Sequence, residues 1–271
     1  MMVLAISVTR IPAIARTKPE LPALRPTPQS TQLDLGKPFH TRSPWRLVVT
    51  EGVPAKDYGD NDAPGALTLC LQKGSAETCL SDPVTPPLRA RKSEDANAWE
   101  PHYLLTAKVV YPGGPERAPF LLLVTGSLYS GNGDQIISTQ VLRYDAGRDE
   151  FRRILEKSTG HNNNQEIRFI AEGPLRGSVI TAEPQQQPPY GYWIEVITLS
   201  SAGAYRQVLR YLSATRYNDG NPLAVIDAEM PTIQNRLGLW KPGEPLPTPS
   251  AANNSKPCIH PTLKRSVLWC E

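Results

Sequence analysis

The stretch SLYSGNGDQIISTQVLRYDAGRDEFRRILEKSTGHNNNQEIRFI, residues 127–170, decides the fold, because polar turns alternate in it with short patterned segments. Residues 135–144 alternate in side-chain character, and a four-residue turn joins them to residues 150–155. Residues 165–171 follow after an asparagine-rich turn. A two-residue alternation bounded by Gly, Asn and Asp is typical of β-strands joined as hairpins.

The same alternation continues in both directions along the chain. It predicts further strands, at residues 45–50, 66–71, 103–111, 120–125, 178–182, 190–199, 204–212 and 222–229. We expect only residues 232–237 to form a helical turn, with Gly238 as its C-cap. The chain is therefore predicted to be all-β, an antiparallel meander of hairpins arranged as a propeller or a sandwich, with almost no helix.

Proline content divides the chain into three parts, because many of its 28 prolines lie near the ends and in loops. Residues 1–44 are interpreted as a proline-rich lead, residues 45–246 as the β domain, and residues 247–271 as a linker with a disulfide-closed tail. Residues 1–8 are apolar, and Ala13-Ile14-Ala15 resembles a small-x-small cleavage site. Without a basic segment before it, the start is either a degraded signal peptide or an unstructured tail.

Composition argues against several classes of function. The net charge is only +3 and no block of Lys and Arg occurs, so we expect no nucleic-acid partner. No apolar run approaches the roughly 18 residues of a transmembrane helix. The chain also lacks a Gly-x-Ser-x-Gly elbow, a phosphate loop and a dinucleotide fingerprint.

The four cysteines favour export to an oxidising compartment. If the chain turns at residues 73–76, Cys70 falls directly opposite Cys79, within the range that a disulfide tolerates. Cys258 and Cys270 then remain to close a loop at the end of the chain. Zinc is the alternative, but no C-x₂-C spacing occurs and His260 is the only nearby histidine. We therefore predict the pairs Cys70–Cys79 and Cys258–Cys270, and a periplasmic or secreted location.

An acidic loop is the candidate metal site. Asp57, Asp60 and Asp62 offer the hard oxygen ligands that Ca²⁺ prefers. The alternative is a solvated loop in which Asp and Asn serve turn geometry. The expectation is no cofactor, with calcium left open.

Polar loops rich in Asp, Asn and Gly precede three of the expected strands: Asp60-Asn61-Asp62, Asn132-Gly133-Asp134 and Asn218-Asp219-Gly220-Asn221. This layout resembles the FG-GAP or VCBS-type repeats of secreted β-propellers. The resemblance implies a propeller-like fold with calcium in such loops, although none of the three loops has the alternating Asp-x-Asp-x-Asp-Gly run.

Two acidic residues are the first candidates for catalysis. Asp227 and Glu229 would share one face of a strand at residues 222–229. Paired carboxylates carry out glycoside hydrolysis, and Glu166 is a third candidate. The alternative is structural, with both carboxylates paired with Arg216 or Arg236.

A ligand site is a further hypothesis. Amide and charged groups beside aromatic rings suit a sugar or a peptide, and the candidates are Asn162, Asn164, Arg168, Tyr190, Tyr192 and Trp193. The alternative is that the asparagines form a turn and the rings belong to the core.

The sequence therefore predicts an exported β domain with a binding or structural role, with no chemistry identified and a glycan or a protein as partner. Two alternatives stay open: a carbohydrate-active hydrolase, and a secreted effector or inhibitor that binds another protein.

Overall fold

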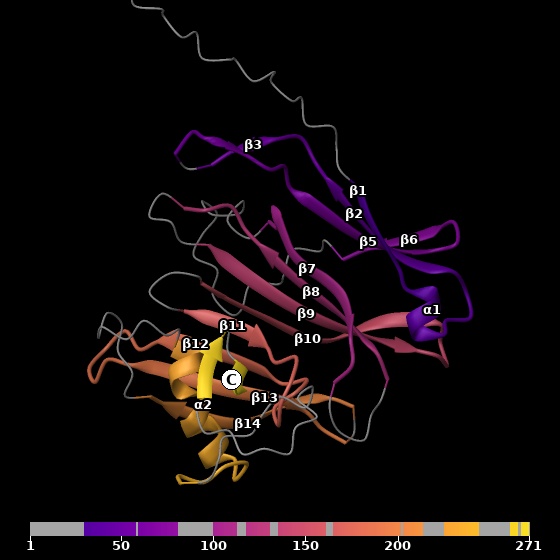
Figure 1. The fold of residues 1–271 in the computed structure, drawn as a ribbon. Helices are drawn as coiled ribbons and strands as arrows, with labels where there is room; N and C mark the ends of the chain where they lie inside the picture. Colours follow the sequence, from indigo (N-terminus) through magenta and orange to yellow (C-terminus); the bar gives the residue numbers. More distant parts are fainter. Residues whose placement is uncertain are drawn as a thin grey trace, which may run out of the picture.

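The computed structural model describes residues 30–57, 59–80, 100–112, 118–130, 135–160, 165–201, 203–213 and 225–243, together with the backbone of residues 261–264 and 267–270. Three four-stranded antiparallel sheets make up most of this part of the chain (Figure 1). Of the two helices in the described residues, neither has the length and the apolar run of a membrane crossing. The fold is all-β, as the sequence predicts.

The first sheet has the strand order β1-β2-β5-β6. Its strands are β1 (Ser30–Asp34), β2 (Trp45–Glu51), β5 (Leu67–Lys73) and β6 (Ala76–Cys79). A short helix, α1 (Gly36–Phe39), joins β1 to β2, and the small pair β3 (Ala55–Lys56) and β4 (Asp62–Ala63) lies between β2 and β5.

The second and third sheets are simple meanders. The second has the order β10-β9-β8-β7 and consists of β7 (Tyr103–Val110), β8 (Phe120–Gly126), β9 (Ile136–Asp145) and β10 (Glu150–Gly160). The third has the order β11-β12-β13-β14 and consists of β11 (Glu166–Phe169), β12 (Val179–Pro184), β13 (Tyr192–Leu199) and β14 (Tyr205–Leu212). A four-stranded antiparallel meander is also the form of a propeller blade.

Helix α2 (Val225–Arg236) follows the third sheet, and a last hairpin pairs β15 (Pro261–Lys264) with β16 (Val267–Cys270). The described elements form a stack in which the second sheet lies between the first and the third, and α2 covers the outer face of the third (Figure 1).

The alternation along β8 shows why the layers stack. Leu121 and Leu123 pack against the first sheet, in a cluster with Leu47 and Leu69. Phe120 and Leu122 point the other way, in a cluster with Phe169 of the third sheet. A strand that is apolar on both faces must be covered on both, so the second sheet is sandwiched between its neighbours.

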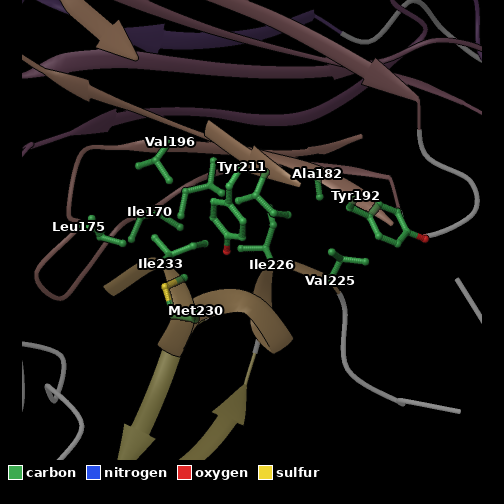
Figure 2. Packing of buried hydrophobic residues seen from close by; sticks show 12 residues of the cluster. Ile170, Leu175, Ala182, Tyr192, Val196, Tyr211, Val225, Ile226, Met230 and Ile233 are labelled. Carbon is green, nitrogen blue, oxygen red and sulfur yellow. The ribbon is translucent and has the colours of Figure 1, made fainter. Parts of the chain in front are cut away.

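Figure 2 shows the junction between the third sheet and α2. Tyr211 of β14 lies among Ile226, Met230 and Ile233 of the helix, all of them buried. Ile226, Met230 and Ile233 are spaced i, i+4 and i+7, which places them on one helical face. This spacing explains why the segment folds as a helix.

The predicted strand at residues 222–229 is therefore wrong, because α2 begins at Val225 within the described residues. The two-residue alternation around Asp227 and Glu229 favours a strand over this short segment, and Pro231 interrupts the longer helical period. The predicted helical turn is part of this longer helix. Gly238 follows it with φ of 68° and its N–H donates to the carbonyl of Asn235, as a left-handed C-terminal glycine does.

The described residues include regular structure before Trp45, the expected start of the β domain, because β1 covers Ser30–Asp34. Strand β1 pairs with β2 in a register that places Leu33 opposite Leu47. Leu35 is fully buried, so the end of the predicted lead contributes to the core.

The Cys70–Cys79 prediction is confirmed in both register and bond. Cys70 lies opposite Cys79 and Gln72 opposite Glu77, and the two cysteines form a disulfide with their Cα atoms 3.8 Å apart. Gly74 turns the hairpin with φ of 58°. Cys258 lies outside the described residues, so the second pair stays a prediction.

Candidate functional site

Three of the residues selected from the sequence come together where the third sheet meets α2. Glu166 and Arg168 project from the same face of β11, as their two-residue spacing predicts. Asp227 comes from the first turn of α2. We call Glu166, Arg168 and Asp227 the acidic cluster.

The guanidinium of Arg168 is the centre of the acidic cluster. Its Nη1 donates to Asp227 Oδ1 at 2.8 Å and its Nη2 to Asp227 Oδ2 at 3.3 Å, a two-pronged contact. Nη2 also donates to Glu166 Oε2 at 2.6 Å. The three side chains expose 8–19% of their surface, so the ion pairs are largely shielded from water.

Glu166 also binds the beginning of the helix. Its Oε1 accepts a hydrogen bond from the backbone N–H of Ile226, one of the first-turn amides that have no partner inside a helix. Asp227, in the same first turn, places a negative charge at the positive end of the helix dipole. The acidic cluster therefore fixes the first turn of α2 against the edge strand of the third sheet.

The charges within the cluster do not balance, because two carboxylates share one guanidinium. Burial raises the pKa of Glu166, and the charge of Asp227 adds to this, while Arg168 and the Ile226 N–H oppose it. A carboxyl group that holds its proton more firmly is the kind of group that general-acid catalysis uses. Both of its oxygens, however, accept hydrogen bonds from the protein.

Glu229 lies apart from the acidic cluster. Residues two apart on a helix are separated by about 200° around its axis, so Asp227 and Glu229 do not share a face. Glu229 Oε2 accepts a hydrogen bond of 2.7 Å from the hydroxyl of Tyr211, where burial and Glu229 raise the pKa of the phenol. The expected pair of carboxylates on one strand face is therefore wrong.

The structural alternative named Arg216 and Arg236 as partners for these carboxylates. Asp227 pairs with Arg168 instead, and the guanidinium of Arg236 lies 4.1 Å from the ring centroid of Tyr211. Arg216 lies outside the described residues.

The expected ligand residues do not converge. Tyr192 faces α2 and is 1% exposed, whereas Trp193 points to the opposite face of β13. Trp193 Nε1 donates to Gln185 at 2.6 Å, and the guanidinium of Arg210 lies 4.2 Å from its ring centroid. Tyr190 is exposed in the loop before β13. Asn162 and Asn164 lie outside the described residues.

The acidic loop uses its carboxylates locally. Asp57 Oδ1 accepts hydrogen bonds from the backbone N–H groups of Gly59 and Asn61, and these bonds lower the pKa of Asp57. Asp62 pairs with Lys56 at 2.7 Å. Among the described residues, three metal-ligating atoms gather within 4.8 Å only at Cys70, Glu77 and Cys79, where both cysteines are in the disulfide. Asp57, Asp60 and Asp62 thus do not converge on one point.

Asp149 is a charged centre at the end of the turn that the sequence predicts before residues 150–155. Its carboxylate accepts hydrogen bonds from Ser43, Trp45 and Tyr144, at 2.6, 3.0 and 2.6 Å, and pairs with Lys73 at 2.7 Å. Lys73 and these neutral donors hold the pKa of Asp149 far below its usual range. Three of the four partners lie far from Asp149 in the sequence, so no local signal could have revealed it.

An ion pair stands at each junction of the stack. Lys73 and Asp149 link the first and second sheets, and Lys157 and Glu195 link the second and third. The contact between Arg168 and Asp227 links the third sheet to α2. Among the described residues, the acidic cluster thus joins two successive layers, as the Lys73–Asp149 and Lys157–Glu195 pairs do at the other junctions.

Comparison of the chain with known proteins adds little to this description of the site. No family model matches the chain, and no solved structure matches it. Two arginine–tRNA ligases, from two strains of Thermus thermophilus, are each 25% identical to it over 171 residues. The chain spans 28% of the length of these ligases, and 60% of the chain is covered. At this identity and coverage the similarity assigns the chain to no family.

Proposed function

We propose that this protein has a binding or structural role in the cell envelope or outside the cell. The observation that carries the proposal is the position of the catalytic candidates. Glu166 and Asp227 connect a strand to a helix, and Glu229 is bonded to Tyr211. Carboxylates that hold elements together serve the scaffold, and function on a β scaffold then falls to the surface and the loops.

The disulfide supports the proposed location. Disulfides persist in oxidising compartments and are rare where thiols are kept reduced. Cys70 and Cys79 form such a bond within the first sheet. The four-stranded meanders are likewise compatible with the propeller-like arrangement that the FG-GAP or VCBS-type resemblance implies.

A carbohydrate-active hydrolase is the second candidate, and one observation favours it. Burial raises the pKa of Glu166, and a general acid in glycoside hydrolysis needs a carboxyl group of this kind. One observation counts against a hydrolase: both carboxylate oxygens of Glu166 already accept hydrogen bonds from the protein, one from Arg168 and one from the N–H of Ile226.

The similarity to arginine–tRNA ligases supports no proposal of aminoacylation, because it covers 28% of those enzymes at 25% identity. The small net charge likewise supports a partner other than a nucleic acid.

Substitution separates the two candidates. Glu166→Gln and Asp227→Asn are made singly and assayed for release of reducing sugar from a panel of glycans, with the free energy of unfolding measured on the same samples. The structural reading predicts no hydrolysis by the unsubstituted protein and loss of stability in the Asp227→Asn variant. The proposal would be overturned if the unsubstituted protein hydrolysed a glycan and the Glu166→Gln or Asp227→Asn variant was stable but did not.

The compartment has its own test. Cells that express the protein are lysed with a thiol-blocking reagent present, and the peptides are mapped without reduction. Export predicts a linked Cys70–Cys79 peptide; blocked, unlinked Cys70 and Cys79 would contradict it.

A further inference from the structure

Cys70, Glu77 and Cys79 bring three metal-ligating atoms within 4.8 Å of one another. We call these three side chains the cysteine cluster. The two cysteines are joined in the disulfide, so their sulfur atoms do not bind a metal ion in this state. Because the thiolate is the form of cysteine that ligates metals, reduction of the disulfide turns both sulfur atoms into ligands.

The register places the cysteine cluster on one face of the first sheet. Cys70 lies directly opposite Cys79, and Glu77 precedes Cys79 by two residues on β6. Opposed residues of antiparallel strands project to the same side, and so do residues two apart on one strand. Leu69 and Leu71, on either side of Cys70, pack against the second sheet, so the cysteine cluster lies on the outer face of the first.

A reductant can reach the disulfide from the end of this sheet. Strand β6 is the last strand in the order of the first sheet, and all four of its residues are exposed. Cys79 is therefore open to solvent, although Cys70 is only 4% exposed. Exposed disulfides are the ones that exchange with thiols and act as labile or regulatory bonds. The position of the bond thus allows its reduction in the folded chain.

Glu77 adds a negative charge beside the two sulfur atoms. Gln72 lies opposite Glu77, and its neutral amide donates a hydrogen bond of 3.4 Å to Glu77 Oε1. This contact orients the carboxylate without neutralising it. Two thiolates and one carboxylate together carry three negative charges, which a divalent cation offsets.

The donor set favours zinc among the divalent cations. Zinc accepts thiolate sulfur at about 2.3 Å and carboxylate oxygen at about 2.0–2.2 Å, in tetrahedral sites whose fourth position can be water. Calcium and magnesium prefer oxygen ligands alone. Two sulfur atoms on one zinc ion lie about 3.8 Å apart, and opposed side chains reach this separation by rotation about their Cα–Cβ bonds.

We propose that Cys70, Cys79 and Glu77 bind one zinc ion when the disulfide between the two cysteines is reduced. A dithiol reductant transfers two electrons and two protons: the sulfur–sulfur bond breaks, two cysteine thiols form, and the reductant becomes a disulfide. Zinc then takes both sulfur atoms as thiolates and releases the two thiol protons. The disulfide and the zinc ion exclude each other, because both need the same sulfur atoms. The inference goes beyond the proposed binding or structural role and does not rest on it.

The test uses zinc alone as the probe, on the full-length chain with Cys258→Ser and Cys270→Ser so that no other thiol competes. The chain is reduced with dithiothreitol, freed of the reductant without oxygen, and titrated with zinc against a coloured chelator. We expect one zinc ion per reduced chain. Loss of an outer-shell partner alone lowers metal affinity about 10–100-fold, so the oxidised chain, which lacks two ligands, should bind zinc more than about 100-fold more weakly.

Single substitutions then test each ligand. Glu77→Gln should lower the zinc affinity of the reduced chain by about tenfold or more, because the amide carries no charge. Glu150→Gln, at an exposed carboxylate of the second sheet, is the matched control and should leave the affinity unchanged. Cobalt in place of zinc gives a spectroscopic readout: thiolate-to-cobalt charge-transfer absorption should appear in the reduced chain and be lost in the Cys79→Ser variant.

Stability gives an independent readout. Zinc should raise the thermal midpoint of the reduced chain and leave that of the oxidised chain unchanged, because only the reduced chain has the site. The chain with all four cysteines is measured in parallel, so that a folding defect of the doubly substituted chain does not decide the result.

Each of four results would overturn the inference. The first is a disulfide that dithiothreitol does not reduce in the folded chain, and the second is a reduced chain that binds no zinc. The third is an oxidised chain that binds zinc as tightly as the reduced one. The fourth is an unchanged affinity in the Glu77→Gln or the Cys79→Ser variant.

Discussion

One carboxylate oxygen of Glu166 accepts a hydrogen bond from Arg168, and the other accepts one from the backbone N–H of Ile226 in the first turn of α2. The Glu166 side chain is only 12% exposed to water. The desolvation of this carboxylate opposes its ionisation, while its contacts favour it, and desolvation is the larger effect. At Asp149 the outcome is the opposite, because contacts with Lys73 and three neutral donors outweigh desolvation and lower the pKa of its carboxyl group. Two carboxylates that both join layers therefore contribute to stability with opposite dependence on pH.

The sign for Glu166 follows from its raised pKa. The folded chain binds the proton more tightly than the unfolded chain does, so this residue's contribution is full below the ordinary value of 4.5 and is lost as the pH rises through the folded pKa. For Asp149 and Asp57 the folded pKa is lowered, so their contributions are lost as the pH falls.

Glu166→Gln should remove the first of these dependences. The amide keeps an oxygen for the Ile226 N–H and cannot ionise, so the variant should gain stability relative to the unsubstituted protein as the pH rises above 4.5. Urea unfolding at a series of pH values measures the difference. Glu150→Gln is the control: its side chain is 43% exposed, so the stability of this variant should change with pH as that of the unsubstituted protein does. If the stability of the Glu166→Gln variant also ran parallel to that of the unsubstituted protein, the account would be contradicted.

Single residues also show where sequence reasoning succeeds and where it stops. The two-residue period placed Glu166 and Arg168 on one strand face and Cys70 opposite Cys79, because strand geometry is local. The partner of Arg168 is Asp227, 59 positions away, and that of Asp149 is Lys73. No periodicity encodes such contacts, since they arise only after the layers have stacked.

At the scale of elements, α2 completes the third sheet. Ile180, Ala182, Ile194 and Val196 would otherwise present an apolar face to water, and Val225, Ile226, Met230 and Ile233 cover it (Figure 2). Apart from β1, which fell in the expected proline-rich lead, the strands of the three sheets were predictable from their alternation. Helix α2 was not, because its apolar residues are few and Pro231 interrupts them. A short apolar run does not by itself distinguish a buried helix from a strand.

Ile233→Ala should therefore be costly. Ile233 is fully buried between α2 and the third sheet, and its truncation leaves a cavity, so we expect a loss of about 2–5 kcal/mol in the free energy of unfolding. Val208→Ala on β14, where the side chain is 48% exposed, is the control and should change stability by less than about 0.5 kcal/mol. Equal effects of the two substitutions would mean that α2 does not pack as described.

Strand β1 makes a second prediction at this scale. A chain that begins at Gly36 lacks β1 and the buried Leu35, so it should unfold at a clearly lower temperature than a chain that begins at residue 30. Differential scanning calorimetry of both chains measures the difference. Equal midpoints would show that the pairing of β1 with β2 contributes nothing to stability.

At the scale of the whole molecule, the chain builds a stack one sheet at a time. Each four-stranded meander is contiguous in sequence apart from the β3–β4 insertion, so strand order follows chain order in the second and third sheets. An all-β meander was predictable for this reason. The number of layers and the helical cover were not, because they depend on which faces meet.

The ion pairs between layers are also a feature of the whole molecule. Clusters of apolar side chains hold the layers together, and an ion pair accompanies each junction. Apolar contact is not directional, whereas a shielded ion pair is satisfied in only one alignment. We therefore interpret the ion pairs as contacts that fix how successive layers are aligned.

The central claim is that Arg168 and Asp227 form a structural contact between the third sheet and α2. A double-mutant cycle with Arg168→Met and Asp227→Asn, measured by urea unfolding, tests it most directly. We predict that each single substitution costs about 3–5 kcal/mol and that the double variant costs less than their sum by about 0.5–3 kcal/mol.

The exposed pair of Arg152 and Glu150 is the control, and its coupling should be below about 1 kcal/mol. Single variants of Arg168 and Asp227 that both unfold within about 0.5 kcal/mol of the unsubstituted protein, with no coupling between them, would contradict the structural role of the acidic cluster.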